Sequence, residues 1–74
     1  MRFVAFCKCK DVEERNIIVK MLQVEHIMPT IDGLEVEVEY EVREGSWPLY
    51  ATTTIDKISS IFELVEKHNI RYIS

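Results

Sequence analysis

The chain of 74 residues is long enough for one small domain, residues 1–74, and too short for a second. Its composition, with 47% hydrophobic side chains, two glycines and two prolines, is typical of a folded protein rather than a disordered one. Its formal charge of −4 argues against direct binding to nucleic acid or to an anionic membrane, because these polyanions attract clustered Lys and Arg.

The first third of the chain predicts a strand and then a helix. Residues 2–9 (RFVAFCKC) are rich in aromatic and β-branched side chains, which is typical of a strand. Residues 11–14 (DVEE) have the form of a capping box, and apolar side chains then recur at helical spacing over residues 12–25. We expect this amphipathic helix to end before Pro29.

Residues 34–43 (LEVEVEYEVR) alternate between apolar and charged side chains. Because successive strand residues point to opposite faces, this pattern predicts a strand with one buried face and one acidic face. A turn at residues 44–46 (EGS) separates it from residues 47–55 (WPLYATTTI), which predict a second strand and hence a hairpin. The acidic face consists of Glu35, Glu37, Glu39 and Glu41, followed by Arg43.

The last third predicts a second helix and a final strand. Thr54 or Asp56 can cap a helix that continues to His68 and Asn69, and residues 70–74 (IRYIS) then form a short strand. The order strand, helix, strand, strand, helix, strand predicts a ferredoxin-like α+β fold, with four antiparallel strands and both helices on one face. In its usual strand order, 4-1-3-2, the acidic strand would lie at an edge and residues 2–9 in the centre.

Cys7 and Cys9 raise the question of a redox or metal site. In a strand their Cβ atoms lie about 6.6 Å apart, whereas a disulfide needs about 4 Å. His26 and His68 would complete a zinc site, but topology brings only His68 near both cysteines, which leaves three ligands and no fourth. We therefore expect core cysteines, no metal and no cofactor, with zinc as the alternative. Two free thiols, no apolar run of about 18 residues and no secretory signal predict a cytosolic protein without membrane contact.

The acidic strand face has two interpretations. Its charges either discourage pairing at an exposed sheet edge or form a docking surface for a basic protein. An uncovered sheet face with apolar side chains in its centre favours a second sheet packed on it, from a partner or from a second copy in a homodimer. Trp47 either closes the end of the core or is an exposed contact residue. The other side chains expected on the open face are Val4, Phe6, Lys8, Lys10, Tyr50, Thr52 and Thr54.

The chain offers no Ser-His-Asp grouping and no activated cysteine, so we expect binding rather than catalysis. The leading hypothesis is a protein-binding inhibitor or adaptor, such as the small proteins that viruses use against host factors. The alternative is a homodimeric small-molecule sensor, because the overall arrangement is similar to regulatory modules of the ACT type. That resemblance implies a ligand near the loop after the first strand, which is KCKDVEER here where ACT modules typically carry a glycine. The predicted partner-binding residues are Glu35, Glu37, Glu39, Glu41, Phe6, Lys8, Lys10, Tyr50 and Trp47.

Overall fold

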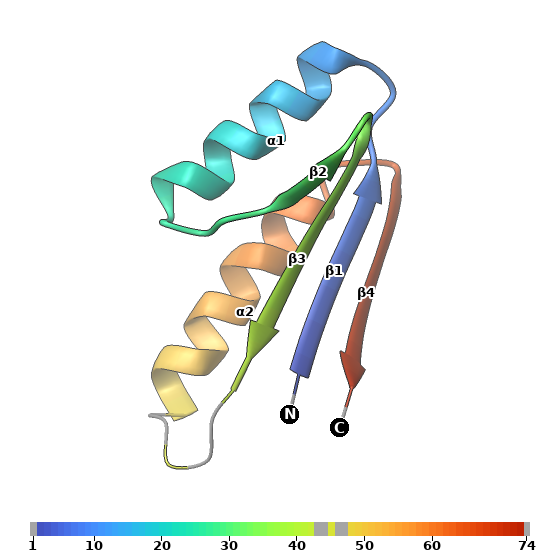
Figure 1. The fold of residues 1–74 in the computed structure, drawn as a ribbon. Helices are drawn as coiled ribbons and strands as arrows, with labels where there is room; N and C mark the ends of the chain where they lie inside the picture. Colours follow the sequence, from blue (N-terminus) through green and yellow to red (C-terminus); the bar gives the residue numbers. More distant parts are fainter. Residues whose placement is uncertain (1, 43–44, 46–47, 74) are drawn as a thin grey trace.

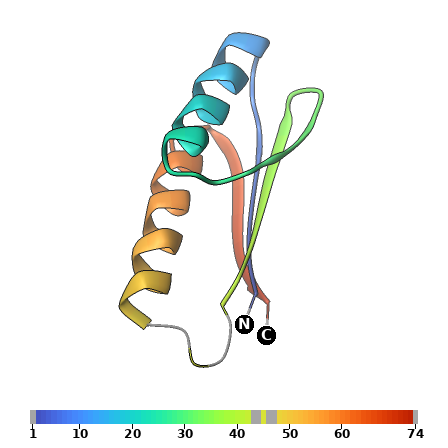
Figure 2. The ribbon, with the colours of Figure 1, turned by 60° about the vertical axis from the view of Figure 1, so that its left-hand side comes forward.

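The computed structural model describes residues 2–42, 45 and 48–73, and its strands form one antiparallel sheet in the order β2-β3-β1-β4. Both helices lie on the same face of this sheet, as Figure 1 and Figure 2 show. The predicted ferredoxin-like α+β fold is confirmed. Among the described residues, neither helix is long and apolar enough to span a membrane. The elements are β1 (Arg2–Lys8), α1 (Val12–Val24), β2 (Thr30–Asp32), β3 (Glu35–Glu41), α2 (Pro48–Phe62) and β4 (Lys67–Ile73).

Helix α1 is capped at both ends by hydrogen bonds to residues close by in the sequence. The Asp11 side chain accepts a hydrogen bond from the N–H of Glu14 (2.8 Å), as predicted from the capping box. At the other end, the N–H of Ile27 donates to the carbonyl of Leu22 (2.9 Å), and His26 has a φ of 59°. This is a Schellman arrangement with histidine, rather than the usual glycine, in the left-handed position.

The acidic strand is the third strand of the sheet, not the second, because a short strand that we did not predict precedes it. A tight turn at Gly33 connects β2 to β3. Its φ of +60° is a conformation that glycine adopts without steric cost. The prediction that the acidic strand lies at an edge was therefore wrong: β3 lies between β2 and β1. However, β2 pairs only with Glu35, Val36 and Glu37. Figure 1 shows that it runs beside only one end of β3.

Helix α2 occupies most of the segment that we predicted as a strand over residues 47–55, and that prediction was wrong. Its Thr53 and Thr54 hydroxyls donate to the carbonyls of Leu49 (2.8 Å) and Tyr50 (3.0 Å), one helical turn earlier. The helix also ends earlier than predicted, at Phe62, so that residues 67–69 begin β4 instead of closing the helix. Trp47 lies outside the described residues.

The core lies between the sheet and the two helices. Alternate residues of β1, namely Phe3, Ala5 and Cys7, are fully buried beneath them, and Cys9 is buried just after the strand. The Phe3 ring packs edge-on against Tyr72 of β4, with 5.3 Å between ring centroids. The helices and the remaining strands contribute Ile18, Leu22, Val36, Val38, Ile55, Ile58, Ile61 and Phe62, together with Val65.

Candidate functional site

The face of the sheet opposite the helices is uncovered in the described structure, and we call it the open face (Figure 2). Its membership follows from alternation: because Phe3, Ala5 and Cys7 point to the core, their neighbours along β1 point away from it. The strand registers then place residues of β3 and β4 beside them. The open face consists of Arg2, Val4, Phe6 and Lys8 on β1, Thr30 and Asp32 on β2, Glu35, Glu37, Glu39 and Glu41 on β3, and Lys67, Asn69, Arg71 and Ile73 on β4.

The four glutamates of β3, which we call the acidic column, differ in what stands across from them on β1. Glu35 is paired with Lys8 and Glu41 with Arg2, so each of these carboxylates has a cation as its cross-strand neighbour. Glu37 and Glu39 are instead paired with Phe6 and Val4. Among the described residues, no cation lies within ion-pair distance of any carboxylate in the column. Glu37 and Glu39 are therefore the two carboxylates of the acidic column without a cationic neighbour on β1.

The opposite side of the open face is basic and comes from β4. Arg71 is paired with Val4 and Lys67 with Lys8, while Asn69 is paired with Phe6. A shallow hollow of about 260 Å³ lies over the centre of the face, with Glu37 on one side and Arg71 on the other. The sequence did not identify Asn69 and Arg71 as site residues, because residues 67–69 resembled a helix end. Their alternation with Ile70 and Tyr72 was the available signal.

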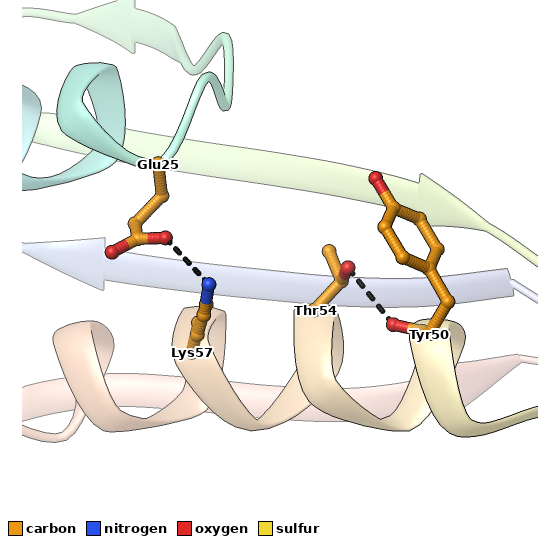
Figure 3. A network of polar contacts seen from close by, with 4 residues as sticks. All are labelled: Glu25, Tyr50, Thr54 and Lys57. Carbon is orange, nitrogen blue, oxygen red and sulfur yellow. Dashed lines mark hydrogen bonds and ion pairs between the residues drawn. The ribbon is translucent and has the colours of Figure 1, made fainter.

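A second hollow, of about 490 Å³, lies where β2 no longer covers β3, and we call it the edge groove. Its walls are residues 25–28 after α1, residues 38–40 of β3, and Tyr50, Thr53, Thr54 and Lys57 of α2. Lys57 and Glu25 form an ion pair (2.9 Å) that links the two helical walls, as Figure 3 shows. Met28 and Tyr50 are 87% and 69% exposed, which is high for large apolar side chains.

The structure brings together most, but not all, of the predicted contact residues. Phe6, Lys8 and the acidic column share the open face, as predicted. Tyr50 lies on α2 and lines the edge groove instead, and Thr54 lines it too. Lys10 follows the end of β1, where its N–H donates to a carboxylate oxygen of Glu14 (3.0 Å), and so it does not extend the strand face.

The two cysteines are free and buried in the core. Burial, followed by the neighbouring Cys9, raises the pKa of the Cys7 thiol to about 12. Burial also raises the pKa of Cys9. Neither thiol is thus a thiolate near neutral pH, which is the form that acts as a nucleophile or metal ligand.

His68 is in β4, paired with Cys7, and not in a last helical turn as we predicted. Its Nδ1 donates to the carbonyl of Val65 (2.6 Å), so this nitrogen carries the proton. Among the residues described here, no three His, Cys, Asp or Glu side chains lie together as a metal site would need. A third hollow, of about 430 Å³, lies at this end of the sheet beside Lys8, Cys9 and Lys10.

Comparisons of the chain with protein-family models, with curated proteins and with solved structures found no match.

Proposed function

We propose that this protein is a small, non-enzymatic binding module of the cytosol, an inhibitor or adaptor that docks through its open face on a protein with a basic surface. The feature that carries this proposal is the position of Glu37 and Glu39, which stand beside Phe6 and Val4 rather than beside cations. Two adjacent carboxylates without a compensating charge repel each other. A basic partner would remove that repulsion on docking.

The rest of the open face supports a protein as the partner. The central hollow offers an apolar surface at Phe6 between a carboxylate and a guanidinium group, so it can accept a side chain and orient it. Charges of opposite sign on the two sides of the face would fix the direction in which a partner docks. The net charge of −4 disfavours a nucleic acid on the same surface.

The test compares two charge variants that change different parts of the acidic column. Affinity capture from the native host, read by mass spectrometry, identifies proteins retained by the wild-type chain. Glu37→Lys with Glu39→Lys should then weaken binding to the retained protein at least about tenfold in a titration with purified components. Glu35→Gln with Glu41→Gln is the control, because these residues already have cationic neighbours, and it should bind nearly as well as the wild type.

Circular dichroism would first establish that both double variants retain the fold. The proposal fails if no protein is retained, or if the lysine substitutions at residues 37 and 39 leave the affinity unchanged. It also fails if the glutamine control at residues 35 and 41 loses as much affinity as the lysine variant at residues 37 and 39.

A second candidate function is the sensing of a small molecule by a homodimer similar to the ACT type. The hollow beside Lys8, Cys9 and Lys10 favours it, because it lies at the loop where that resemblance places a ligand. Two copies could also close their open faces on each other, with the acidic column of one against the basic side of the other. Sedimentation and a thermal-shift screen test this function: a monomer whose melting temperature no metabolite changes would exclude it.

A further inference from the structure

The backbone of β3 has a free edge beside the edge groove. The N–H of Cys9 donates to the carbonyl of Leu34 (2.8 Å), so the backbone groups of Leu34 point toward β1. Because these directions alternate along a strand, the N–H and C=O groups of the glutamates point to the other side, toward β2. Of the four glutamates, only Glu35 and Glu37 are paired with β2. Among the described residues, no strand therefore lies beside the backbone groups of Glu39 and Glu41.

The two sides of this edge differ chemically. On the open face, the side chains that flank it are the carboxylates of Glu37, Glu39 and Glu41. On the helix side, it is flanked by the edge groove, where Met28 and Tyr50 stand exposed. A strand added here would project alternate side chains to these two environments.

We propose that the free edge of β3 binds an extended segment of a partner protein in which basic and apolar residues alternate. The segment lies antiparallel to β3, in line with β2, and forms backbone hydrogen bonds with Glu39 and Glu41. Its Lys or Arg side chains lie beside the acidic column, and its apolar side chains enter the edge groove. This inference rests on the proposed function, since it specifies the partner's chemistry at the same acidic strand.

Charge also selects against a second copy of this chain as the occupant. Antiparallel pairing of two β3 edges would place glutamates of one acidic column directly opposite those of the other. Like charges in directly opposed positions are destabilising, whereas opposite charges there are favourable. The acidic column therefore disfavours pairing with β3 of a second copy and favours pairing with a basic strand.

The test uses a blocked pentapeptide, VKVKV, and two N-methylated forms of it. In the proposed pairing, the two lysine residues lie opposite Glu39 and Glu41 and present their backbone N–H groups to β3, and the valine residues present theirs to solvent. Methylation of one lysine amide should weaken binding at least about tenfold, because it removes one hydrogen bond and blocks close approach. Methylation of a valine amide is the matched control and should weaken binding less. Titrations followed by NMR should show the largest amide shifts at Glu39 and Glu41.

Several results would overturn the inference. The inference is wrong if the unmodified peptide does not bind, if both methylated forms bind equally well, or if the amides of Glu39 and Glu41 do not shift. If the peptide fails while partner binding still depends on Glu37 and Glu39, only this inference falls. If partner binding is indifferent to those glutamates, the proposed function falls.

Discussion

Replacing Glu37 and Glu39 together by glutamine should make the protein more stable. Alternate residues on one strand face lie about 6.6 Å apart. The double variant removes the repulsion between every pair of neighbouring carboxylates in the acidic column, which are 35 with 37, 37 with 39, and 39 with 41. It gives up little in return, because the cross-strand neighbours of Glu37 and Glu39 on β1 are apolar.

The gain can be calculated from Coulomb's law. Two unit charges about 6.6 Å apart in water repel each other by about 0.6 kcal/mol. At physiological ionic strength the Debye length is about 8 Å, which reduces this repulsion to about 0.3 kcal/mol for each pair. The free energy of unfolding should therefore rise by about 0.8 kcal/mol, and the melting temperature by about 3 to 6 °C.

Urea unfolding followed by circular dichroism measures this gain, at physiological salt and again at 1 M salt. At the higher salt the gain should fall to about 0.2 kcal/mol, because the Debye length shrinks to about 3 Å. The control is Glu41→Gln, which relieves its repulsion with Glu39 but loses the attraction to Arg2, worth about 0.2 to 1 kcal/mol. The reasoning is refuted if the first variant gains nothing, if its gain survives 1 M salt, or if the control gains as much.

Three further predictions concern the core, the end of α1 and the edge of β3. The raised pKa of Cys7 means that the unfolded chain releases a proton above about pH 9 that the folded chain retains to about pH 12. Stability should therefore decline as the pH rises through this window, and Cys7→Ala should remove that part of the decline in urea unfolding. His26→Gly should raise the free energy of unfolding by about 1 kcal/mol in calorimetry, since it relieves a left-handed backbone; no gain, or an equal gain for His26→Ala, would contradict this. Glu39→Pro should be tolerated, because the N–H of Glu39 points to the free edge. Val38→Pro should lower the free energy of unfolding by at least about 1 to 3 kcal/mol, because it removes a buried hydrogen bond to β1. Equal losses of stability in thermal unfolding would mean that the backbone N–H groups of β3 do not point in these directions.

The fold class was predicted correctly, but only because the unpredicted strand β2 took the place of the strand wrongly expected over residues 47–55. The acidic column and α1 were predicted for the right reason, since they depend on strong periodic patterns: the strict alternation of β3, and the cap and apolar stripe of α1. A pattern with period two places every glutamate on one face whatever its neighbours are. This is why the column was predicted correctly even though its position in the sheet was not.

The sequence was not sufficient where local preference and tertiary packing disagree. Three consecutive threonines and an isoleucine favour a strand by propensity, yet Ala51, Ile55, Ile58 and Phe62 recur at helical spacing and are buried. Packing of that stripe against β1 determines the outcome, and the threonine hydroxyls bond within the helix. Because residues 48–62 form a helix, the remaining strand that contributes side chains to the open face is β4. The open face therefore contains Arg71, whereas the sequence predicted Tyr50 there.

The central position of β1 also dictates the order in which the sheet can assemble. One neighbour of β1 is β3, but the other is β4, which follows all the other described elements along the chain, and this ladder joins Arg2 to Ile73. Contacts so distant along the chain close slowly, because a long loop must be ordered before any of them forms. During synthesis, the edge of β1 that pairs with β4 therefore stays unpaired until β4 has left the ribosome. For that interval the nascent chain exposes a second strand edge, and it is the one that lacks glutamates to keep other strands away.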